Sequence, residues 1–525
     1  MVEVVTGTTA NWQAGILSGF LAVALAFSGA ANAAEPSGER VAKALEQLDS
    51  MAAAAITDGG VPGLAIAVVH KDEIVFLKGY GLREAGKPEA VNADTVFQLA
   101  SLSKPLSATV VAALVSDGLV SWDTPVSTLD PAFQLRDAYP TQQVTVRDLF
   151  AHRSGLPGNA GNELEDLGFD RDTILSRLRH VPPASSFRAG YSYSNFGLTE
   201  GAVAAAKPTG KLWEDVAQEK LYGPLGMSAT SSRYADFLAR DNRAALHIGN
   251  PKAWEAKLTR EPDAQSPAGG VSSSARDLAQ WVRLELAHGR YSGQQIIAKE
   301  AIDATHVPLM PRGQNPVTGA TSFYGLGWNV ELDRHGLSWG HAGAFSTGAR
   351  TLVTLYPESD IGIVVLSNAF PTGVPEDLAD SFFDLVFSGE ISQDWSNSWN
   401  AIYAGLFGPA TEAAKKQYAT PPSGALRAMP LTNYVGTYTN AYIGEVKVTA
   451  EDGKLELQAG PGGRKRYPLT HFSRDTFVSY PFEDIPDMPE GVTFMLGSDG
   501  QATQVTIEML NDFGMGTLQR VATEP

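Results

Sequence analysis

The chain has 525 residues, of which 43% are hydrophobic and 19% are charged, with a formal net charge of −18 and no cysteine. Such a length and composition are typical of a globular protein with more than one domain. The acidic charge argues against binding to nucleic acid or to an anionic membrane, and the lack of cysteine excludes disulfides and zinc–thiolate sites. The nine histidines are scattered without the spacing of metal ligands, so we expect neither a metal nor another cofactor.

The first 33 residues have the pattern of an export signal. Residues 16–27 form an apolar run that is too short to span a bilayer comfortably, and residues 31–33 form a small-x-small cleavage site. The start of the chain carries Glu3 but no lysine or arginine, so a hydrophobic N-terminal helix is the alternative. We expect residues 1–33 to be a signal peptide and the mature protein to be periplasmic or secreted, without a stable membrane anchor.

Hydrophobic patterning predicts the secondary structure in outline. The expected elements, in chain order, are a helix at 41–57, strands at 64–69 and 74–80, a helix- and loop-rich stretch from about 104 to 260, strands at 351–355 and 361–366, and a helix at 377–387. The stretch from about 104 to 260 indicates an all-α subdomain between two strand-containing regions.

Ser101 and Lys104 form the most informative motif, because they pair a nucleophile with a proton acceptor one helical turn apart. Residues 105–114 are rich in alanine and leucine and predict a buried helix. A serine at the start of a helix lies where backbone N–H groups can stabilise an oxyanion. A lysine in an apolar site loses its proton more readily, as a general base must.

Two further motifs follow. Tyr193 and Asn195 lie in a Gly- and aromatic-rich loop that runs into a helix, and His341 and Gly343 precede strand-like segments. With these three motifs in order, residues 45 to 388 resemble the β-lactamase-related serine hydrolases, which include class C β-lactamases, D-alanyl-D-alanine peptidases, D-aminopeptidases and family VIII carboxylesterases. Other segments that fit the same pattern are 149–157, 224–227, 267–271, 277–281 and 324–328.

The resemblance implies a role for each motif residue. Ser101 would attack the substrate carbonyl, and Lys104 and Tyr193 would share its proton, with the pKa of Tyr193 lowered by the neighbouring ammonium. Which of the two is the formal base stays open, because a coupled pair titrates as a unit. Asn195 would bind the substrate carbonyl, and the backbone N–H groups of Ser101 and Ala344 would form the oxyanion hole.

His341 departs from many relatives, in which the third motif begins with a lysine that recognises carboxylates and β-lactams. A histidine is mostly neutral at pH 7. We therefore expect His341, together with Gly343 and Ala344, to bind substrate through hydrogen bonds and not through a fixed charge. Efficient β-lactam hydrolysis is not expected from such a site.

Ser338 offers an alternative nucleophile, because residues 336–340 fit the G-x-S-x-G pattern of α/β-hydrolases. That pattern works only at a strained turn from a strand into a helix, with Asp and His later in the chain. Here the flanking residues indicate strands on both sides. We therefore reject Ser338 as the nucleophile.

The resemblance also implies an α/β (α+β) fold, in which helices and an all-α subdomain flank an antiparallel sheet. The site would lie between the sheet edge that carries His341 and the helical part that carries Ser101 and Tyr193. This domain is expected at 34–389 and a linker at 390–428.

Residues 429–525 differ from the rest, because they consist of short alternating strands with a hairpin signal at 451–453. They resemble the small lipocalin-like β-barrel that is often appended to this hydrolase family. In relatives such a domain lends a loop to the cleft or supports oligomerisation, and the sequence does not choose between these roles.

These observations predict a serine hydrolase that cleaves an amide or ester bond of a small-molecule ester or peptide through an acyl-enzyme on Ser101. His341 favours a peptidase or amidohydrolase of small or D-residue-containing peptides, and a family VIII-type carboxylesterase is the alternative. A β-lactamase, or a sensor that is acylated without turnover, is less favoured. The chain could also form a homo-oligomer.

Overall fold

The computed structural model describes residues 36–522, apart from the side chains at 404, 406 and 407. The predicted signal peptide at 1–33 lies outside the described residues. Within the described part of the chain, no helix combines the length and apolar character needed to cross a membrane.

An eight-stranded sheet organises the N-terminal domain, in the order β2-β1-β14-β13-β12-β11-β10-β9. All its neighbouring strands are antiparallel. The strands are β1 (Gly63–His70), β2 (Glu73–Gly81), β9 (Met310–Gln314), β10 (Thr321–Tyr324), β11 (Asn329–Asp333), β12 (Gly336–Phe345), β13 (Ala349–Tyr356) and β14 (Ile361–Ser367). The N-terminal hairpin joins the late strands through the pairing of β1 with β14.

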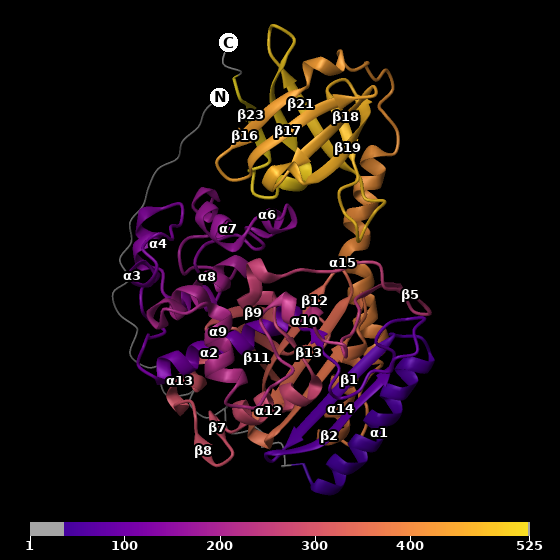
Figure 1. Cartoon of the computed structure of the whole chain (residues 1–525). Helices are drawn as coiled ribbons and strands as arrows, with labels where there is room; N and C mark the ends of the chain where they lie inside the picture. The colour runs from indigo at the N-terminus through magenta and orange to yellow at the C-terminus, as the bar shows by residue number, and fades with distance from the viewer. Residues whose placement is uncertain (1–35, 523–525) are drawn as a thin grey trace, which may run out of the picture. The chain divides into compact units, whose positions relative to one another are not determined.

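Helices cover both faces of this sheet (Figure 1). Helices α1 (Gly38–Thr57) and α14 (Val374–Phe387) pack on one face, where Leu64 and Ile66 of β1 point. Ala65 and Ala67 point to the opposite face and join a core that includes three helices, α2 (Ser103–Ser116), α8 (Asn195–Ala206) and α12 (Ala275–Leu286). Because side chains alternate along a strand, an apolar strand such as β1 can be buried on both sides.

The second face carries the helix-rich part of the domain. Residues 104–260 are mainly helices and loops as predicted, but they are not all-α, because the short strands β4 (His247–Asn250) and β5 (Ala253–Glu255) lie within them. Its helices are α2 (Ser103–Ser116), α3 (Val126–Leu129), α4 (Ala138–Gln143), α5 (Val146–Phe150), α6 (Asn162–Asp166), α7 (Arg171–Arg177), α8 (Asn195–Ala206), α9 (Trp213–Ala217), α10 (Tyr234–Leu238), α11 (Ser266–Gly269), α12 (Ala275–Leu286) and α13 (Lys299–Asp303). Short strands outside the main sheet are β3 (Phe97–Gln98), β4 (His247–Asn250), β5 (Ala253–Glu255), β6 (Ser272–Ser273), β7 (Arg290–Tyr291), β8 (Gln294–Gln295) and β15 (Ala369–Phe370).

Helix α15 (Trp395–Tyr418) occupies most of the segment that we expected to be a linker. Pro409 lies inside this helix, which makes it a poor helix by local propensity. Contacts with α14 stabilise it instead. The indole of Trp399 donates to Asp380 at 2.7 Å, and the hydroxyl of Tyr403 donates to Glu376 at 2.9 Å. Tertiary packing, which the sequence pattern does not reveal, therefore orders this segment.

The C-terminal strands close into an eight-stranded barrel, in which β16 pairs with both β17 and β23. The strands are β16 (Gly436–Asn440), β17 (Gly444–Glu451), β18 (Lys454–Ala459), β19 (Lys465–Ser473), β20 (Thr476–Ser479), β21 (Glu490–Leu496), β22 (Ala502–Ile507) and β23 (Thr517–Arg520). Val446 and Val448 are buried while Glu445 and Lys447 are exposed, the alternation expected of a barrel wall. The predicted β-barrel is confirmed.

Candidate active site

Ser101 lies in a single 3₁₀ turn, η1 (Ala100–Leu102), immediately before the buried helix α2. Ala100, the residue before it, has a φ of 49°, a left-handed conformation that is strained for a residue with a Cβ atom. This turn presents Ser101 ahead of the helix and brings the Lys104 amine to 3.0 Å from the Ser101 hydroxyl. The two residues therefore lie together, as their spacing predicts.

Lys104 is fully buried, and burial holds the pKa of its amine well below the usual range. Besides Ser101, its Nζ lies 2.7 Å from Oδ1 of Asn195 and 2.9 Å from the carbonyl oxygen of Ala268. A neutral amine has two N–H donors and one lone pair. In that form the two obligate acceptors, Asn195 Oδ1 and Ala268 O, would take both donors, and the lone pair would remain for the Ser101 hydroxyl.

Tyr193 and Asn195 reach this point because Ser194, between them, is the N-cap of α8. The Ser194 hydroxyl accepts a hydrogen bond from the Gly197 amide at 3.1 Å. Asn195 thus begins the helix and faces Lys104, while Tyr193 precedes it and lies with its ring centroid 4.5 Å from the Lys104 amine. The spacing of this motif is that of a helix cap with one functional residue on either side.

Our expectation for the pKa of Tyr193 is wrong. Burial raises it above the usual tyrosine range, and hydrogen bonding to Ser101 opposes the shift without reversing it. The expected lowering required a charged ammonium next to the phenol. Burial also favours the neutral form of Lys104, which weakens the charge that would stabilise a phenolate, and the raised pKa of Tyr193 favours its protonated phenol.

His341 lies on β12 and is only 5% exposed. Its Nδ1 lies 2.7 Å from the carbonyl oxygen of Ala342, to which it donates, and its Nε2 accepts from the Tyr324 hydroxyl at 3.0 Å. Burial lowers the pKa of His341 to about 3, so the ring is neutral at pH 7. The position holds a hydrogen-bonding ring and no fixed charge.

Gly343 and Ala344 follow on the same strand, beside the turn that carries Ser101. A Cβ atom on Gly343 would lie 2.1 Å from the carbonyl oxygen of Leu99, so only glycine permits this approach. The pairing of β12 with β11 stops at Gly340, which leaves residues 341–345 paired on the β13 side alone within the described residues. Ala344 therefore lies on an open strand edge, where its predicted oxyanion-hole role would require it.

An aromatic wall completes the site. It consists of His152, Tyr191, Tyr193 and Tyr324, of which only Tyr193 was predicted as a site residue. His152 packs between Tyr193 and Tyr324, with ring centroids 4.6 and 4.9 Å apart, and its Nδ1 accepts from the Ser194 amide at 3.1 Å. Tyr191 packs on Tyr324 at 5.4 Å. His152 and Tyr324 belong to the segments 149–157 and 324–328, which fit the family pattern, and this fit could have identified them as site residues.

Two polar residues near this wall had no sequence signal. Asn162 accepts a hydrogen bond from Nδ2 of Asn195 at 3.3 Å. Arg312, on the exposed edge strand β9, lies 5.5 Å from the ring centroid of Tyr191 and donates to the neutral amide of Asn329 at 2.5 Å. The ion pairs found among residues 36–522 do not include Arg312, but its charge acts on Glu331 of β11, where it opposes the rise in pKa that burial causes.

Ser338 lies in the middle of β12 and is 5% exposed. The strand continues through Phe345, so the turn into a helix that a G-x-S-x-G nucleophile needs is absent at this position. The structure supports the rejection of Ser338 as the nucleophile.

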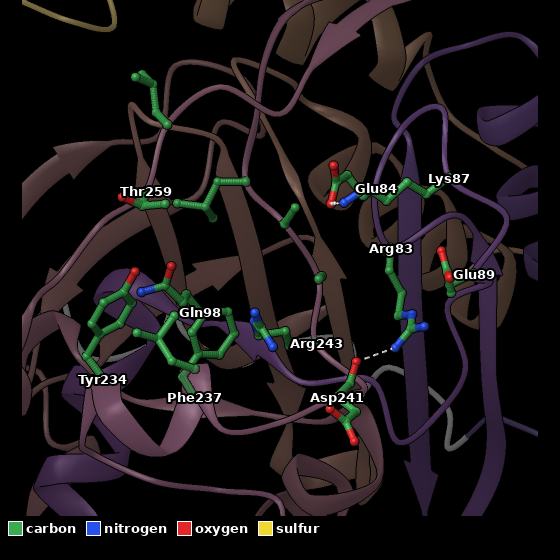
Figure 2. A pocket seen from close by; sticks show the side chains of 15 residues that line it. Arg83, Glu84, Lys87, Glu89, Gln98, Tyr234, Phe237, Asp241, Arg243 and Thr259 are labelled. Atoms are coloured by element: carbon green, nitrogen blue, oxygen red, sulfur yellow. Dashed lines mark hydrogen bonds and ion pairs between the residues drawn. The ribbon is translucent and has the colours of Figure 1, made fainter.

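A separate surface cavity of about 360 Å³ lies near α10 (Figure 2). Its lining includes Arg83, Tyr234, Phe237 and Asp241, and Arg83 donates to the backbone oxygen of Asp241 at 2.6 Å. None of the motif residues lines it. Within the described part of the chain, no group of three or more His, Cys, Asp or Glu side chains is placed to hold a metal ion.

Comparison with known proteins agrees with this geometry. Residues 42–383 match the Beta-lactamase family, and residues 420–520 match a domain of unknown function, DUF3471. The chain is 27% identical to an unguisins hydrolase of Aspergillus campestris, over 73% of this chain and 72% of the relative. It is 28% identical to penicillin-binding protein 4 of Amycolatopsis lactamdurans, over 63% of this chain and 85% of the relative.

Two solved structures share the fold. One is an octameric penicillin-binding protein homologue from Pyrococcus abyssi, with a TM-score of 0.56 and 20% identity, covering 90% of this chain and 99% of that one. The other is SurE, with a TM-score of 0.54 and 20% identity, covering 92% of this chain and 100% of that one. Since the family match spans well over half of the chain, this protein belongs to the Beta-lactamase family and carries a C-terminal DUF3471 domain in the form of an eight-stranded barrel.

Proposed function

We propose that this Beta-lactamase-family protein cleaves an amide bond of a small or D-residue-containing peptide through an acyl-enzyme on Ser101. The observation that carries the proposal is the environment of Lys104. A buried amine whose pKa is lowered, and whose two N–H donors already have acceptors, directs its lone pair at the Ser101 hydroxyl. This is the arrangement of a general base beside its nucleophile.

The chemistry proceeds in two steps. As the bond from Ser101 Oγ to the carbonyl carbon forms, the hydroxyl proton passes to Lys104, and the backbone N–H groups of Ser101 and Ala344 receive the oxyanion. The ammonium then returns the proton through the Tyr193 phenol to the leaving amine as its bond breaks. Water then attacks the acyl carbon of the resulting ester and its proton passes to Lys104. The bond from the acyl carbon to Ser101 Oγ breaks, Lys104 returns the proton to Oγ, and the carboxylic acid product leaves with Ser101 regenerated. Lys104 is the formal base in this scheme, because Tyr193 rests protonated.

The neutral His341 supports a peptidase or amidohydrolase over a β-lactamase, since the fixed cation of the third motif is missing. The relatives named unguisins hydrolases support hydrolysis over sensing without turnover. A carboxylesterase of the family VIII type is the second candidate, because nothing in the Ser101–Lys104 arrangement distinguishes an ester from an amide carbonyl.

A short substrate panel tests the proposal with wild type, Ser101→Ala and the matched control Ser338→Ala. The panel contains D- and L-alanine p-nitroanilides, a D-residue peptide, p-nitrophenyl butyrate and nitrocefin. We expect amide hydrolysis that falls by at least about 10³-fold in Ser101→Ala and is kept in Ser338→Ala. Turnover of the ester alone would favour the carboxylesterase, rapid nitrocefin turnover a β-lactamase, and unchanged activity in Ser101→Ala would refute the proposal.

We also propose that the chain self-associates. The support is a structural neighbour described as octameric, which this chain covers over 99% of its length. Light scattering after size-exclusion chromatography tests this, and a monomeric mass at all concentrations would contradict it.

A further inference from the structure

The barrel meets the helical part of the Beta-lactamase domain through the loop between β16 and β17, next to α6 and α7 (Figure 1). Tyr442, in this loop, is completely buried. Its hydroxyl accepts a hydrogen bond from the Gly161 amide at 2.9 Å and donates to the carboxylate of Glu163. Arg177 of α7 donates to the backbone oxygens of Tyr442 at 3.1 Å and Ile443 at 2.9 Å.

The contact is apolar as well as polar. Tyr442 and Ile443 belong to one continuous buried cluster with Leu164, Ile174 and Phe196 of the helical part. A Cβ atom on Gly161, whose φ is 93°, would lie 2.8 Å from the side chains of both Ile174 and Phe196. Residues 159–163, a turn that leads into the start of α6 and is called the 159–163 turn below, are thus held between the barrel loop and helices α7 and α8.

The same turn contacts the candidate active site. The backbone N–H of Asn159 donates to the backbone carbonyl oxygen of Tyr193 at 3.2 Å. Asn162, which lies between the two partners of Tyr442, donates through Nδ2 to Oδ1 of Asn159 at 3.3 Å and accepts from Nδ2 of Asn195 at 3.3 Å. Oδ1 of Asn195 in turn accepts from Lys104 at 2.7 Å.

This chain of amides fixes which end of Asn195 faces Lys104. With its oxygen toward Lys104, Asn195 takes one N–H of the amine and leaves the lone pair for Ser101. With its amide reversed, Nδ2 would donate to Lys104 and compete for that lone pair. The oxygen of Asn162 selects the first orientation, because it can accept a hydrogen bond from Nδ2 of Asn195 but not from Oδ1 of that residue.

We propose that Tyr442 of the barrel is a positioning residue for the reaction at Ser101: it holds the 159–163 turn so that Asn162 keeps the amide oxygen of Asn195 toward Lys104. The proposal rests on the proposed function, since it assigns Lys104 as the base. The barrel then serves catalysis without placing an atom against the substrate.

The test compares Tyr442→Phe with Tyr438→Phe on p-nitrophenyl butyrate and on the best amide of the panel. Tyr438 is a matched control, because it is also a fully buried barrel tyrosine, but its hydroxyl donates at 2.7 Å to Tyr434 within the barrel. Each variant keeps its ring and loses one buried hydroxyl. We expect kcat to fall about tenfold in Tyr442→Phe with KM little changed, and both to stay at wild-type values in Tyr438→Phe.

A double-mutant cycle separates positioning from simple docking of the barrel. Asn162→Ala should reproduce the loss in kcat, and adding Tyr442→Phe to it should cause little further loss, because both act on the same amide. Melting temperatures and circular dichroism verify that each variant is folded. Equal kcat in Tyr442→Phe and Tyr438→Phe, or losses that multiply in the double variant, would overturn the proposal.

Ser101→Ala in the same assay keeps the two proposals distinguishable. If it stays as active as wild type, the assignment of Ser101 fails. If it is inactive while Tyr442→Phe turns over like wild type, the hydrolase assignment stands and the positioning role of the barrel is wrong.

Discussion

Lys104 on the helical side of the site and His341 on the strand side are both basic side chains, and burial lowers the pKa of both. The chemical result differs. A lysine that loses its charge becomes a neutral amine with a lone pair, and here its Nζ lies 3.0 Å from the Ser101 hydroxyl. A histidine is already close to neutral at pH 7, and with a pKa of about 3 it does not accept a proton in the working range. The same desolvation produces a base on one side and an inert ring on the other.

The partners of the two residues reinforce this difference. Lys104 is surrounded by hydrogen-bond acceptors that belong to helices and turns, namely Asn195 Oδ1 and Ala268 O. His341 uses both of its ring nitrogens within the protein, on Ala342 and Tyr324. Proton transfer is therefore expected on the helical side, and the strand side is expected to shape the site and to bind substrate.

Removal of the base on the helical side should have the largest effect on the reaction. Lys104→Met keeps the length and apolar stem of the side chain but deletes the proton acceptor, so kcat should fall by about 10² to 10⁴-fold. Burst kinetics with p-nitrophenyl butyrate would locate the loss in the acylation step. In wild type, a plot of kcat/KM against pH should fall on the acidic side with an apparent pKa well below that of an ordinary lysine. An apparent pKa of about 10 would contradict a neutral amine at Lys104.

Gly343→Ala tests the close approach of the strand to the nucleophile turn. The added methyl group would lie 2.1 Å from Leu99 O and 2.9 Å from Leu102 N, so η1 must move away from β12. We expect kcat/KM to fall by about 10²-fold, as displacement of a reacting group by about 1 Å can produce. Wild-type kinetics in a folded variant would show that β12 does not set the position of Ser101.

Arg312→Gln tests whether the strand side still has a cation for substrate, supplied by β9 and not by position 341. Because the Arg312 guanidinium lies 5.5 Å from the ring centroid of Tyr191 and forms no ion pair among the described residues, carboxylate-bearing substrates should lose affinity, with KM rising about tenfold. The neutral p-nitrophenyl butyrate is the control substrate, and its KM should not change. Equal changes for both substrates would exclude a specific contact with the carboxylate.

His341→Gln should change the pH dependence of stability more than the rate. Between pH 6.5 and about 3 the unfolded state binds a proton at His341 and the native state does not, so the free energy of unfolding of wild type falls as pH decreases. The contribution is at most about 1.4 kcal/mol per pH unit. Urea unfolding at pH 6.5, 5.5 and 4.5 should show a shallower decline for the variant, and parallel curves would refute the buried neutral ring.

The motifs could be predicted because the residues of each motif lie only two or three positions apart in the sequence. Ser101 and Lys104 meet because consecutive turns bring residues three apart together, and Tyr193 and Asn195 flank a helix N-cap. The central sheet and the barrel could also be predicted. Strands that are buried on both faces are continuous apolar runs, and strands that are buried on one face alternate apolar with polar residues.

Long-range packing decided the rest. The sequence pattern could not show the lowered pKa of Lys104 or the raised pKa of Tyr193, because desolvation depends on every segment that closes over a group. Helix α15 forms across Pro409 through its contacts with α14. The connection from Tyr442 through Asn162 to Asn195 joins residues hundreds of positions apart. The sequence by itself determined which groups could react; the tertiary structure decided their protonation and orientation, because both depend on neighbours distant in the chain.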